Sequence, residues 1–198
     1  MKKIGMLLVV AASFGAAFAG GRTSERFAFA TYREDVNRIT VLVDAAPAAW
    51  NNGEAFIPLH IAVGMDPGRK SVQITPESFR LVDATGKAVA AAGYQELARG
   101  YRRVGYDMAL IRQRPLVVGN LFGTRRVLQA NFYPIAQRGL RTEQVELAPG
   151  TWFHDVIYFP RPAAGIGGVM TLQLSGNGIE VPIEVRFRVP GPAGRDSA

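Results

Sequence analysis

The chain contains no cysteine. This absence excludes disulfide bonds, thiolate metal sites and a lipid-modified cysteine behind a leader. Histidine is scarce as well, because His60 and His154 are the only two in 198 residues. Two histidines are too few for a metal site built from histidine alone, and carboxylate ligands would have to come from distant segments. We therefore predict no metal, no cofactor and a fold that is stabilised by packing alone.

Catalytic motifs are missing too. The sequence has neither a G-x-S-x-G elbow nor a phosphate-binding loop. His154 and Asp155 look like a dyad when written side by side, but neighbouring residues of a strand point to opposite faces. We predict that His154 is a structural, hydrogen-bonded histidine and that His60 lies on the wet face of its strand. No catalytic residue is predicted; a hydrolase would need both histidines to meet a carboxylate in a cleft.

A long hydrophobic run occurs only at the N-terminus. There Lys2 and Lys3 precede an apolar stretch, residues 4–19, that ends in Ala-Phe-Ala. This pattern is typical of a secretory signal peptide, residues 1–19, that is cut before Gly20. An uncleaved anchor is the alternative, but the run is shorter than the roughly 20 residues that a spanning helix needs. We predict an exported protein of the periplasm or cell envelope.

Acidic residues are in the minority. The chain has 16 of them against 23 Lys and Arg, for a formal net charge of +7. Loss of Lys2 and Lys3 with the signal peptide lowers this charge by two, to +5. A basic protein favours anionic partners. For an exported chain we expect these to be lipid head groups, lipopolysaccharide or an acidic protein, and not nucleic acid.

Alternation of apolar and polar residues gives the clearest structural signal. From Ile179 to Val189 every second residue is apolar, which predicts a half-buried strand. Pro182 cannot donate to a ladder and places this strand at a sheet edge or at a bulge. Residues 169–174 form another strand in front of it, and the Ser-Gly-Asn-Gly between the two predicts a tight hairpin.

Other segments carry a similar strand signal. Further strands are predicted at residues 38–44, 56–63, 78–83, 125–133 and 152–159. Seven to nine short strands with turn residues between them indicate a sandwich or a barrel, and their uneven spacing favours a sandwich. We divide the chain into a signal peptide, an N-terminal lead-in, a β-domain with one insertion and a disordered tail: residues 1–19, 20–35, 36–189 with the insertion at 91–124, and 190–198.

The order of these strands and turns resembles a known group of domains. TPESFRLVDATGKAV is followed by LAPGTWFHDVIYFP and by a closing hairpin, GVMTLQLSGNGIEVPIEVRFRV. Over residues 36–189 this order resembles the immunoglobulin-like domains of exported bacterial proteins and lipoproteins. The resemblance implies an all-β, immunoglobulin-like antiparallel β-sandwich that serves as an accessory or binding module without an assigned reaction. The chain departs from that group by lacking a lipidated cysteine and by carrying the insertion.

The insertion has a helical pattern around residues 94–114. Its apolar residues recur at spacings of three and four, which places them within about 100° of one another on a helix. They are Tyr94, Leu97, Tyr101, Val104, Met108 and Ile111. Gly100 and Gly105 each cost about 1 kcal/mol relative to alanine. The segment is therefore either one amphipathic helix or two short ones.

The strand predicted at residues 152–159 indicates where this helix packs. Both of its faces are largely apolar, and such a strand needs cover on each side. One face would meet the core of the sandwich, and the other would lie under the helix. We expect the helix on the outside of the sheet, with its arginines directed to solvent or to a partner.

Arginine concentrates in the same part of the chain. Seven arginines lie between residues 99 and 126, against one acid, Asp107. The run is either a solvated helix face, a solubility device or a contact surface, and arginine favours contact because guanidinium makes bidentate bonds to carboxylate and phosphate. The partner-binding residues would then be Arg99, Arg102, Arg103, Tyr106, Arg114, Arg125 and Arg126.

The sequence thus predicts a binding or accessory subunit of the cell envelope and not an enzyme. Its partner would be a protein or an envelope assembly with an acidic surface. Docking on anionic lipid or lipopolysaccharide is the alternative, and a hydrolase is the third hypothesis.

Overall fold

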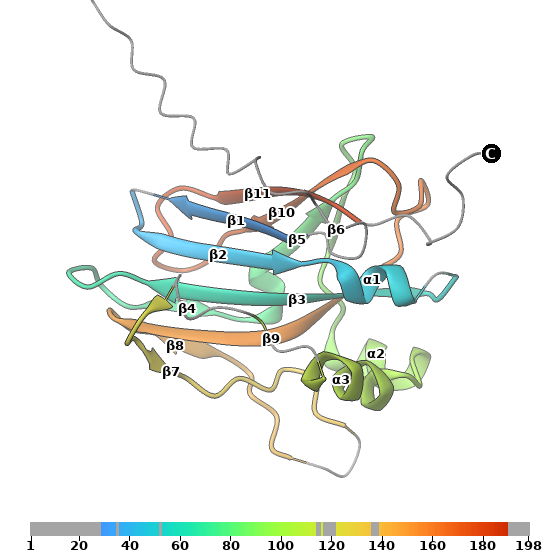
Figure 1. Cartoon of the computed structure of the whole chain (residues 1–198), viewed down its shortest axis with the longest axis horizontal. Helices are drawn as coiled ribbons and strands as arrows, with labels where there is room; N and C mark the ends of the chain where they lie inside the picture. The colour runs from blue at the N-terminus through green and yellow to red at the C-terminus, as the bar shows by residue number, and fades with distance from the viewer. Residues whose placement is uncertain are drawn as a thin grey trace, which may run out of the picture.

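The structure, a computed structural model, describes residues 29–34, 36–51, 53–113, 116, 122–135 and 139–189. The predicted signal peptide and C-terminal tail lie outside these ranges. The described residues form an all-β fold in several sheets, with few helices (Figure 1). None of their helices is both long and apolar enough to cross a membrane.

The strands in chain order are β1 (Phe29–Glu34), β2 (Ile39–Asp44), β3 (Phe56–Met65), β4 (Val72–Ile74), β5 (Phe79–Val82), β6 (Ala88–Ala90), β7 (Arg126–Val127), β8 (Val145–Leu147), β9 (Thr151–Pro160), β10 (Val169–Leu174) and β11 (Ile183–Arg188). The helices are α1 (Ala46–Trp50), α2 (Tyr94–Gly100) and α3 (Val104–Arg112), and a 3-10 turn spans Pro76–Ser78. A five-stranded sheet has the order β1-β2-β3-β9-β7, a four-stranded sheet has the order β11-β10-β5-β6, and β4 pairs with β8. The pairing is antiparallel except between β7 and β9.

The five-stranded sheet is buried on both faces at its centre. Every residue of β3 is buried, as its almost wholly apolar sequence requires. Leu59 lies opposite Ile157 on the first face, which belongs to the main core. His60 and Tyr158 point to the second face, because successive side chains of a strand alternate. This second face is the one that the insertion covers.

The four-stranded sheet has one apolar face and one wet face. In β11 the side chains of Ile183, Val185 and Phe187 are buried, whereas the intervening Glu184 and Arg186 are exposed. Residues from both larger sheets, and from the β4–β8 pair, belong to one hydrophobic cluster. In Figure 1 the four-stranded sheet lies above and behind β2 and β3.

The second face of the five-stranded sheet is covered near the start of β3 and the end of β9. The ring centre of Tyr101, which ends α2, lies 5.7 Å from that of Phe56 and 5.5 Å from that of Tyr158. Figure 1 shows α2 and α3 together beside this end of the sheet. The expectation that the strand at residues 152–159 has a helix over its second face is therefore confirmed at the Tyr158 end of that strand.

The predicted strands match the observed ones where the alternation is long. The strands predicted at residues 38–44, 56–63, 78–83, 152–159 and 169–174 are all present, and β10 pairs with β11 as predicted. A tight turn does form at residues 176–179, where the nitrogen of Ile179 donates to the carbonyl oxygen of Gly176 at 3.1 Å and Gly178 has a φ of 86°. The prediction that the two strands run directly into this turn is wrong. Leu174 pairs with Ile183, so residues 175–182 form a wide loop, and β11 starts after Pro182 at the sheet edge that the proline indicated.

The strand predicted at residues 125–133 is wrong for most of its length. Only β7 pairs with β9 there, and the following residues run beside β9 with single hydrogen bonds. The nitrogen of Phe132, for example, donates to the Asp155 carboxylate over 2.7 Å. Strands β1, β4, β6 and β8 and helix α1 were not predicted. Of these, β1 falls in the segment assigned as a lead-in.

Candidate functional site

The helical hairpin, residues 94–112, carries the main group of predicted contact residues. It consists of α2, a short turn and α3, so the version with two short helices is confirmed. Arg99, Arg102 and Arg112 are exposed, and Tyr106 is 55% exposed. The predicted apolar stripe packs against the core. The hairpin therefore turns its apolar side chains inward and these three arginines outward.

Arg103, between the two helices, is paired within the molecule. Its Nη1 lies 2.9 Å from Oε1 of Glu54, in the loop after α1. Its guanidinium carbon lies 4.9 Å from the ring centre of Tyr106, within the range of a cation–π contact. Arg103 therefore ties the hairpin to a neighbouring loop, and a partner would have to compete for its charge.

The predicted contact residues do not form one surface. Arg126 lies in β7 and pairs with Thr151, the first residue of β9, whereas the hairpin packs on Tyr158 near the other end of that strand. Seven residues of strand separate these two points, a rise of roughly 23 Å. The structure thus brings Arg99 and Arg102 into one helical hairpin and leaves Arg126 at the far end of the sheet.

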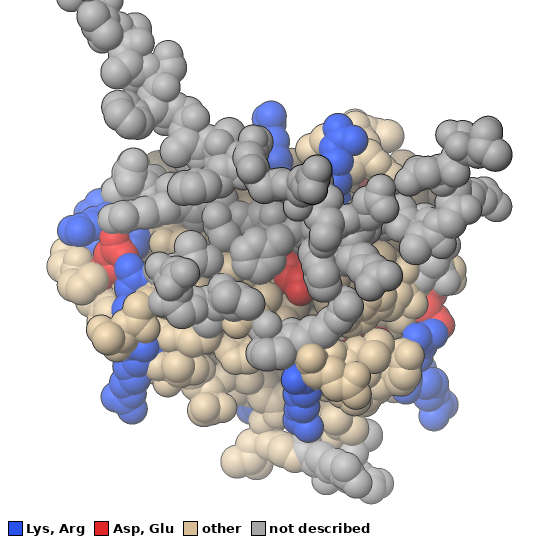
Figure 2. Space-filling view, in the orientation of Figure 1, with Lys and Arg blue, Asp and Glu red and all other residues tan. Residues whose placement is uncertain are grey.

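Arg125 is engaged at that far end. It forms an ion pair with Asp66, a buried acid that also lies 3.9 Å from Nε of Arg38. Arg114 lies outside the described residues. On the face drawn in Figure 2, the visible Lys and Arg side chains stand at separate places and do not form one continuous patch. Three exposed arginines of the hairpin therefore remain as the local basic surface.

A buried carboxylate fixes the hairpin to the sheet. Asp107 of α3 is 1% exposed, and its Oδ2 accepts hydrogen bonds from the hydroxyls of Tyr101 at 2.7 Å and Tyr158 at 3.3 Å. Its Oδ1 accepts a hydrogen bond from Nδ2 of Asn51 at 3.0 Å. Burial raises the pKa of Asp107, and the three donors oppose that rise. One side chain thus connects α3 with α1, α2 and β9.

The sequence contained a signal for this role that our reasoning missed. Asp107 follows Val104 by three residues and precedes Ile111 by four, so it lies inside the apolar stripe and not on the basic face. An acid within an apolar stripe needs buried donors. Sequence spacing does not show that two tyrosines and an asparagine supply them.

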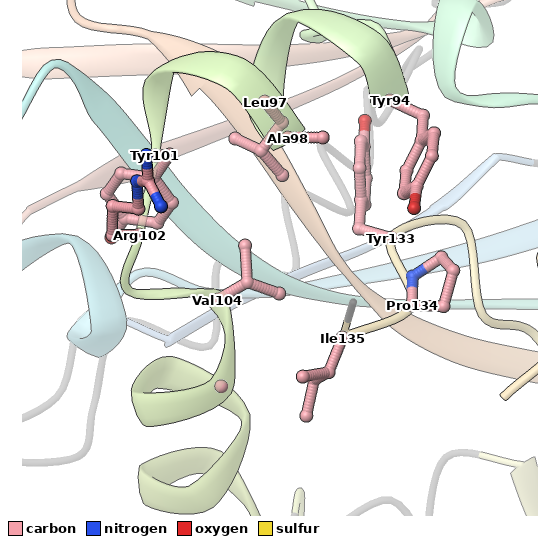
Figure 3. A pocket seen from close by; sticks show the side chains of 10 residues that line it. Tyr94, Leu97, Ala98, Tyr101, Arg102, Val104, Tyr133, Pro134 and Ile135 are labelled. Carbon is pink, nitrogen blue, oxygen red and sulfur yellow. The ribbon is translucent and has the colours of Figure 1, made fainter. Parts of the chain in front are cut away.

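A groove opens between the hairpin and the segment that follows β7 (Figure 3). Its volume is about 190 Å³. The residues that line it are Tyr94, Leu97, Ala98, Tyr101, Arg102, Val104, Gly105, Tyr133, Pro134 and Ile135. It is largely apolar, with Arg102 as the one charged residue of its lining. No pattern in the sequence places residues 133–135 against the helices.

The prediction that His60 is a surface residue is wrong. His60 is 2% exposed because the second face of β3 is covered. Its Nε2 lies 3.1 Å from Nδ1 of His154, so the prediction of a hydrogen-bonded His154 is confirmed. Burial, together with the neighbouring His154, lowers the pKa of His60 to about 3. Both histidines of the chain are therefore used in one pair.

The proton in this pair has a preferred place. Among the described residues, the buried Nδ1 of His60 has no hydrogen-bond partner. A buried N–H without an acceptor costs about 1 to 3 kcal/mol, so the proton belongs on Nε2 of His60, which donates to His154. No group of three or more His, Asp and Glu side chains within the described ranges could hold a metal ion.

Aromatic rings continue from this pair along the second face. The ring of Trp152 stacks on that of His154, with centres 5.5 Å apart, and on that of Phe122, with centres 5.0 Å apart. Phe122 lies over Gly64 so closely that a Cβ on this glycine would overlap its ring. This cluster covers the strand pair β3–β9 at the end away from the hairpin.

Comparison with known proteins gives no match to this chain: no family model, no curated protein and no solved structure is similar to it.

Proposed function

We propose that this protein is an exported, non-catalytic binding or accessory subunit of the bacterial cell envelope, which contacts an anionic partner through its helical hairpin. The observation that carries the proposal is the arrangement of charge on this hairpin. Arg99, Arg102 and Arg112 are exposed, whereas one of the two acids in the same segment, Asp107, is buried among hydroxyl and amide donors. The outer side of the hairpin is therefore basic, apart from Glu96.

Rigidity of the hairpin supports the same proposal. Its position is held by Asp107, by the Arg103–Glu54 ion pair and by the contact of the Tyr101 ring with the ring of Tyr158. A surface that is already ordered loses little conformational entropy when a partner binds. Guanidinium groups on such a surface suit carboxylates or phosphates, because their donors are fixed in a plane.

The fold we propose for this subunit is an immunoglobulin-like β-sandwich. The shared hydrophobic cluster of the two larger sheets and the wet outer face of β10 and β11 support this type. Export is supported by the N-terminal pattern of two lysines, an apolar run and Ala-Phe-Ala. A non-catalytic role is supported by the two histidines, which are the usual groups for proton transfer near neutral pH and here bond to each other.

The test is a charge reversal with a matched control. Arg99→Glu and Arg102→Glu are introduced together into the full chain, and Arg103 is left unchanged because it pairs with Glu54. The control carries Arg186→Glu and Arg188→Glu, on the exposed side of β11. Partners are captured from a detergent extract of the native envelope at low and at high salt.

We expect the hairpin variant to capture at least about tenfold less partner than the wild type, with an unchanged circular dichroism spectrum and melting temperature. The control should retain its partner, and high salt should weaken capture by the wild type. Equal capture by the wild type and the hairpin variant, or an equal loss in the control, would contradict the proposal.

Docking on anionic lipid is a second candidate, which one observation favours. Tyr106 is exposed next to the arginines of the hairpin, and aromatic rings beside cationic side chains suit a membrane interface. Flotation with vesicles that contain anionic lipid separates the two candidates. Binding to the vesicles that fades with salt would favour lipid, and the absence of flotation at low salt would leave the protein partner.

A further inference from the structure

We infer that the groove beside the hairpin receives one large apolar side chain of an acidic segment in the partner protein, with Arg102 bound to a neighbouring carboxylate. This inference rests on the proposed function, since it specifies the chemistry that the hairpin recognises. The size, lining and charge of the groove suit a protein segment as its occupant.

The groove has a buried floor and an exposed rim. Leu97, Tyr101 and Tyr133 form the floor and are 1%, 4% and 1% exposed. The walls, among them Tyr94 and Ile135, are half-buried. Figure 3 shows the lining side chains around an open centre, with those of α2 on one side and that of Ile135 on another.

The polar groups of the floor are already bound within the protein. The Tyr101 hydroxyl donates to Asp107, and the Tyr133 hydroxyl donates to the carbonyl oxygen of Ala92 at 2.8 Å. These two residues therefore present aromatic ring surface to the groove and no free donor. A floor of this kind favours an apolar occupant, because a polar one would lose its hydrogen bonds to water without replacement.

Charge at the rim selects for an acidic surrounding. Arg102 is exposed at the edge of the groove, and Arg99 lies on the same helical hairpin. On the other side the guanidinium carbon of Arg141 lies 5.1 Å from the ring centre of Tyr94, a wall residue. Arg141 also lies 3.9 Å from the carboxylate of Glu143, which offsets part of its charge, so the cationic character of the rim comes mainly from Arg99 and Arg102. An apolar opening beside these arginines complements an apolar side chain with a carboxylate next to it.

The size of the groove fits a single side chain. A volume of about 190 Å³ lies below the roughly 300 to 1,000 Å³ of sites for whole small molecules. Burial of one aromatic or large aliphatic anchor in a desolvated recess is how hot spots of protein interfaces are built.

Gly105 provides a variant that separates binding from folding. It lies in the wall on α3, and a Cβ built on it would meet Ile135 at 3.9 Å, an ordinary contact. Gly105→Ala therefore narrows the groove without a clash, and alanine is the better helix former. The matched control is Gly100→Ala, in the same hairpin but outside the lining, where a Cβ would meet Phe56 at 3.4 Å.

The experiment titrates 3-phenylpropionate into the isotope-labelled full chain and follows amide chemical shifts by NMR. Neutral 3-phenylpropanol and propionate are the comparison probes, because the alcohol lacks the carboxylate and propionate lacks the aromatic ring. We expect saturable shifts at Ala98, Arg102 and Gly105 with a dissociation constant on the order of 1 mM. Binding should weaken by about fivefold in Gly105→Ala and change by less than about twofold in Gly100→Ala.

Arg102→Gln should remove the preference for 3-phenylpropionate over the neutral alcohol. The melting temperature of Gly105→Ala should be equal to or above that of the wild type, which excludes misfolding as the cause of weaker binding. The inference is overturned if the wild type shows no saturable shifts around the groove up to about 20 mM, or if Gly105→Ala binds as tightly as the wild type. Since this test uses no natural partner, its failure is distinct from failure of the charge-reversal capture experiment.

Discussion

At the scale of single residues, Asp107 decides how the helical hairpin meets the rest of the molecule. Its carboxylate accepts from Tyr101, Tyr158 and Asn51, which belong to three different parts of the fold. Removal of the acceptor leaves these donors buried without a partner, and each such donor costs about 1 to 3 kcal/mol. The consequence of a substitution therefore depends on whether an acceptor remains.

We predict that Asp107→Ala lowers the free energy of unfolding by about 3 to 5 kcal/mol. Asp107→Asn should cost about 1 to 2 kcal/mol, because the amide oxygen still accepts from Asn51 and the amide nitrogen donates to a tyrosine oxygen. Urea unfolding followed by circular dichroism measures both values. If the two variants lose the same stability, the hydrogen bonds of Asp107 are not what holds the hairpin.

At the scale of elements, the sequence predicts those strands whose alternating or continuous apolar pattern extends over enough residues to be recognised. Alternation located β11, and continuous apolar character located β3, because these patterns follow from one or two buried faces. Strands β4, β6 and β8 have three residues each, too few for a period of two to stand out. Their pairing is set by contacts between distant segments.

Residues 125–133 show another limit of prediction from sequence. They have the composition of a strand, yet only β7 joins the ladder. Beyond it the backbone of Phe132 donates to the side chain of Asp155 instead of to a backbone carbonyl. A side-chain acceptor on a neighbouring strand can replace a ladder bond, and its position is known only from the fold.

The candidate site was predictable to a similar extent. The spacing of three and four identified the apolar and the exposed faces of the hairpin, including Arg99 and Arg102. Closeness in sequence also led us to group Arg125 and Arg126 with them, and the fold places these at the other end of β9. The groove depends on Ile135, whose position beside α3 has no signature in the sequence.

The packing of Phe122 on the second face of the five-stranded sheet gives a prediction at the same scale. Phe122 lies directly over Gly64, with Trp152 next to both. Gly64→Ala should therefore cost about 1 to 3 kcal/mol, because the new methyl group overlaps the Phe122 ring. In a Phe122→Ala background the same change should cost clearly less, about 1 kcal/mol or below, since the ring is gone and only the Cβ of Trp152 remains close, at 3.1 Å.

A double-mutant cycle in urea measures this coupling between Gly64 and Phe122. Gly167→Ala serves as the control, because a Cβ on that glycine meets nothing within 4 Å. An undiminished cost of Gly64→Ala in the Phe122→Ala background would show that the ring does not lie on this strand.

At the scale of the whole molecule, two buried groups on opposite faces of the five-stranded sheet give the stability opposite dependences on pH. His60 lies on the second face with its pKa lowered to about 3. Asp155 faces the main core, where burial raises its pKa to about 6 although the nitrogens of Phe132 and Val156 donate to it. Both shifts come mainly from loss of water around the charged form.

The direction of each effect follows from which state binds more protons. Below pH 6.5 the unfolded chain protonates His60 and the folded chain does not, so stability falls as the pH falls towards 3. For Asp155 the folded chain holds its proton up to about pH 6, whereas the unfolded chain releases it near 3.8, so stability falls as the pH rises between these values. Between pH 6 and 4 the two trends oppose each other.

We predict that the contributions of His60 and Asp155 to the free energy of unfolding nearly cancel in the wild type between pH 6 and 4.5. Replacing either residue should therefore change the pH dependence of stability, in opposite directions for the two variants. Relative to the wild type, His60→Gln should gain about 2 kcal/mol as the pH falls through this window, because the loss of stability that His60 causes is removed. Asp155→Asn should lose about 2 kcal/mol over the same fall. Urea unfolding at a series of pH values gives these slopes, and the slopes are compared instead of absolute stabilities, since each substitution also removes a hydrogen bond. Equal slopes in the two variants would mean that neither group is buried in the form described here.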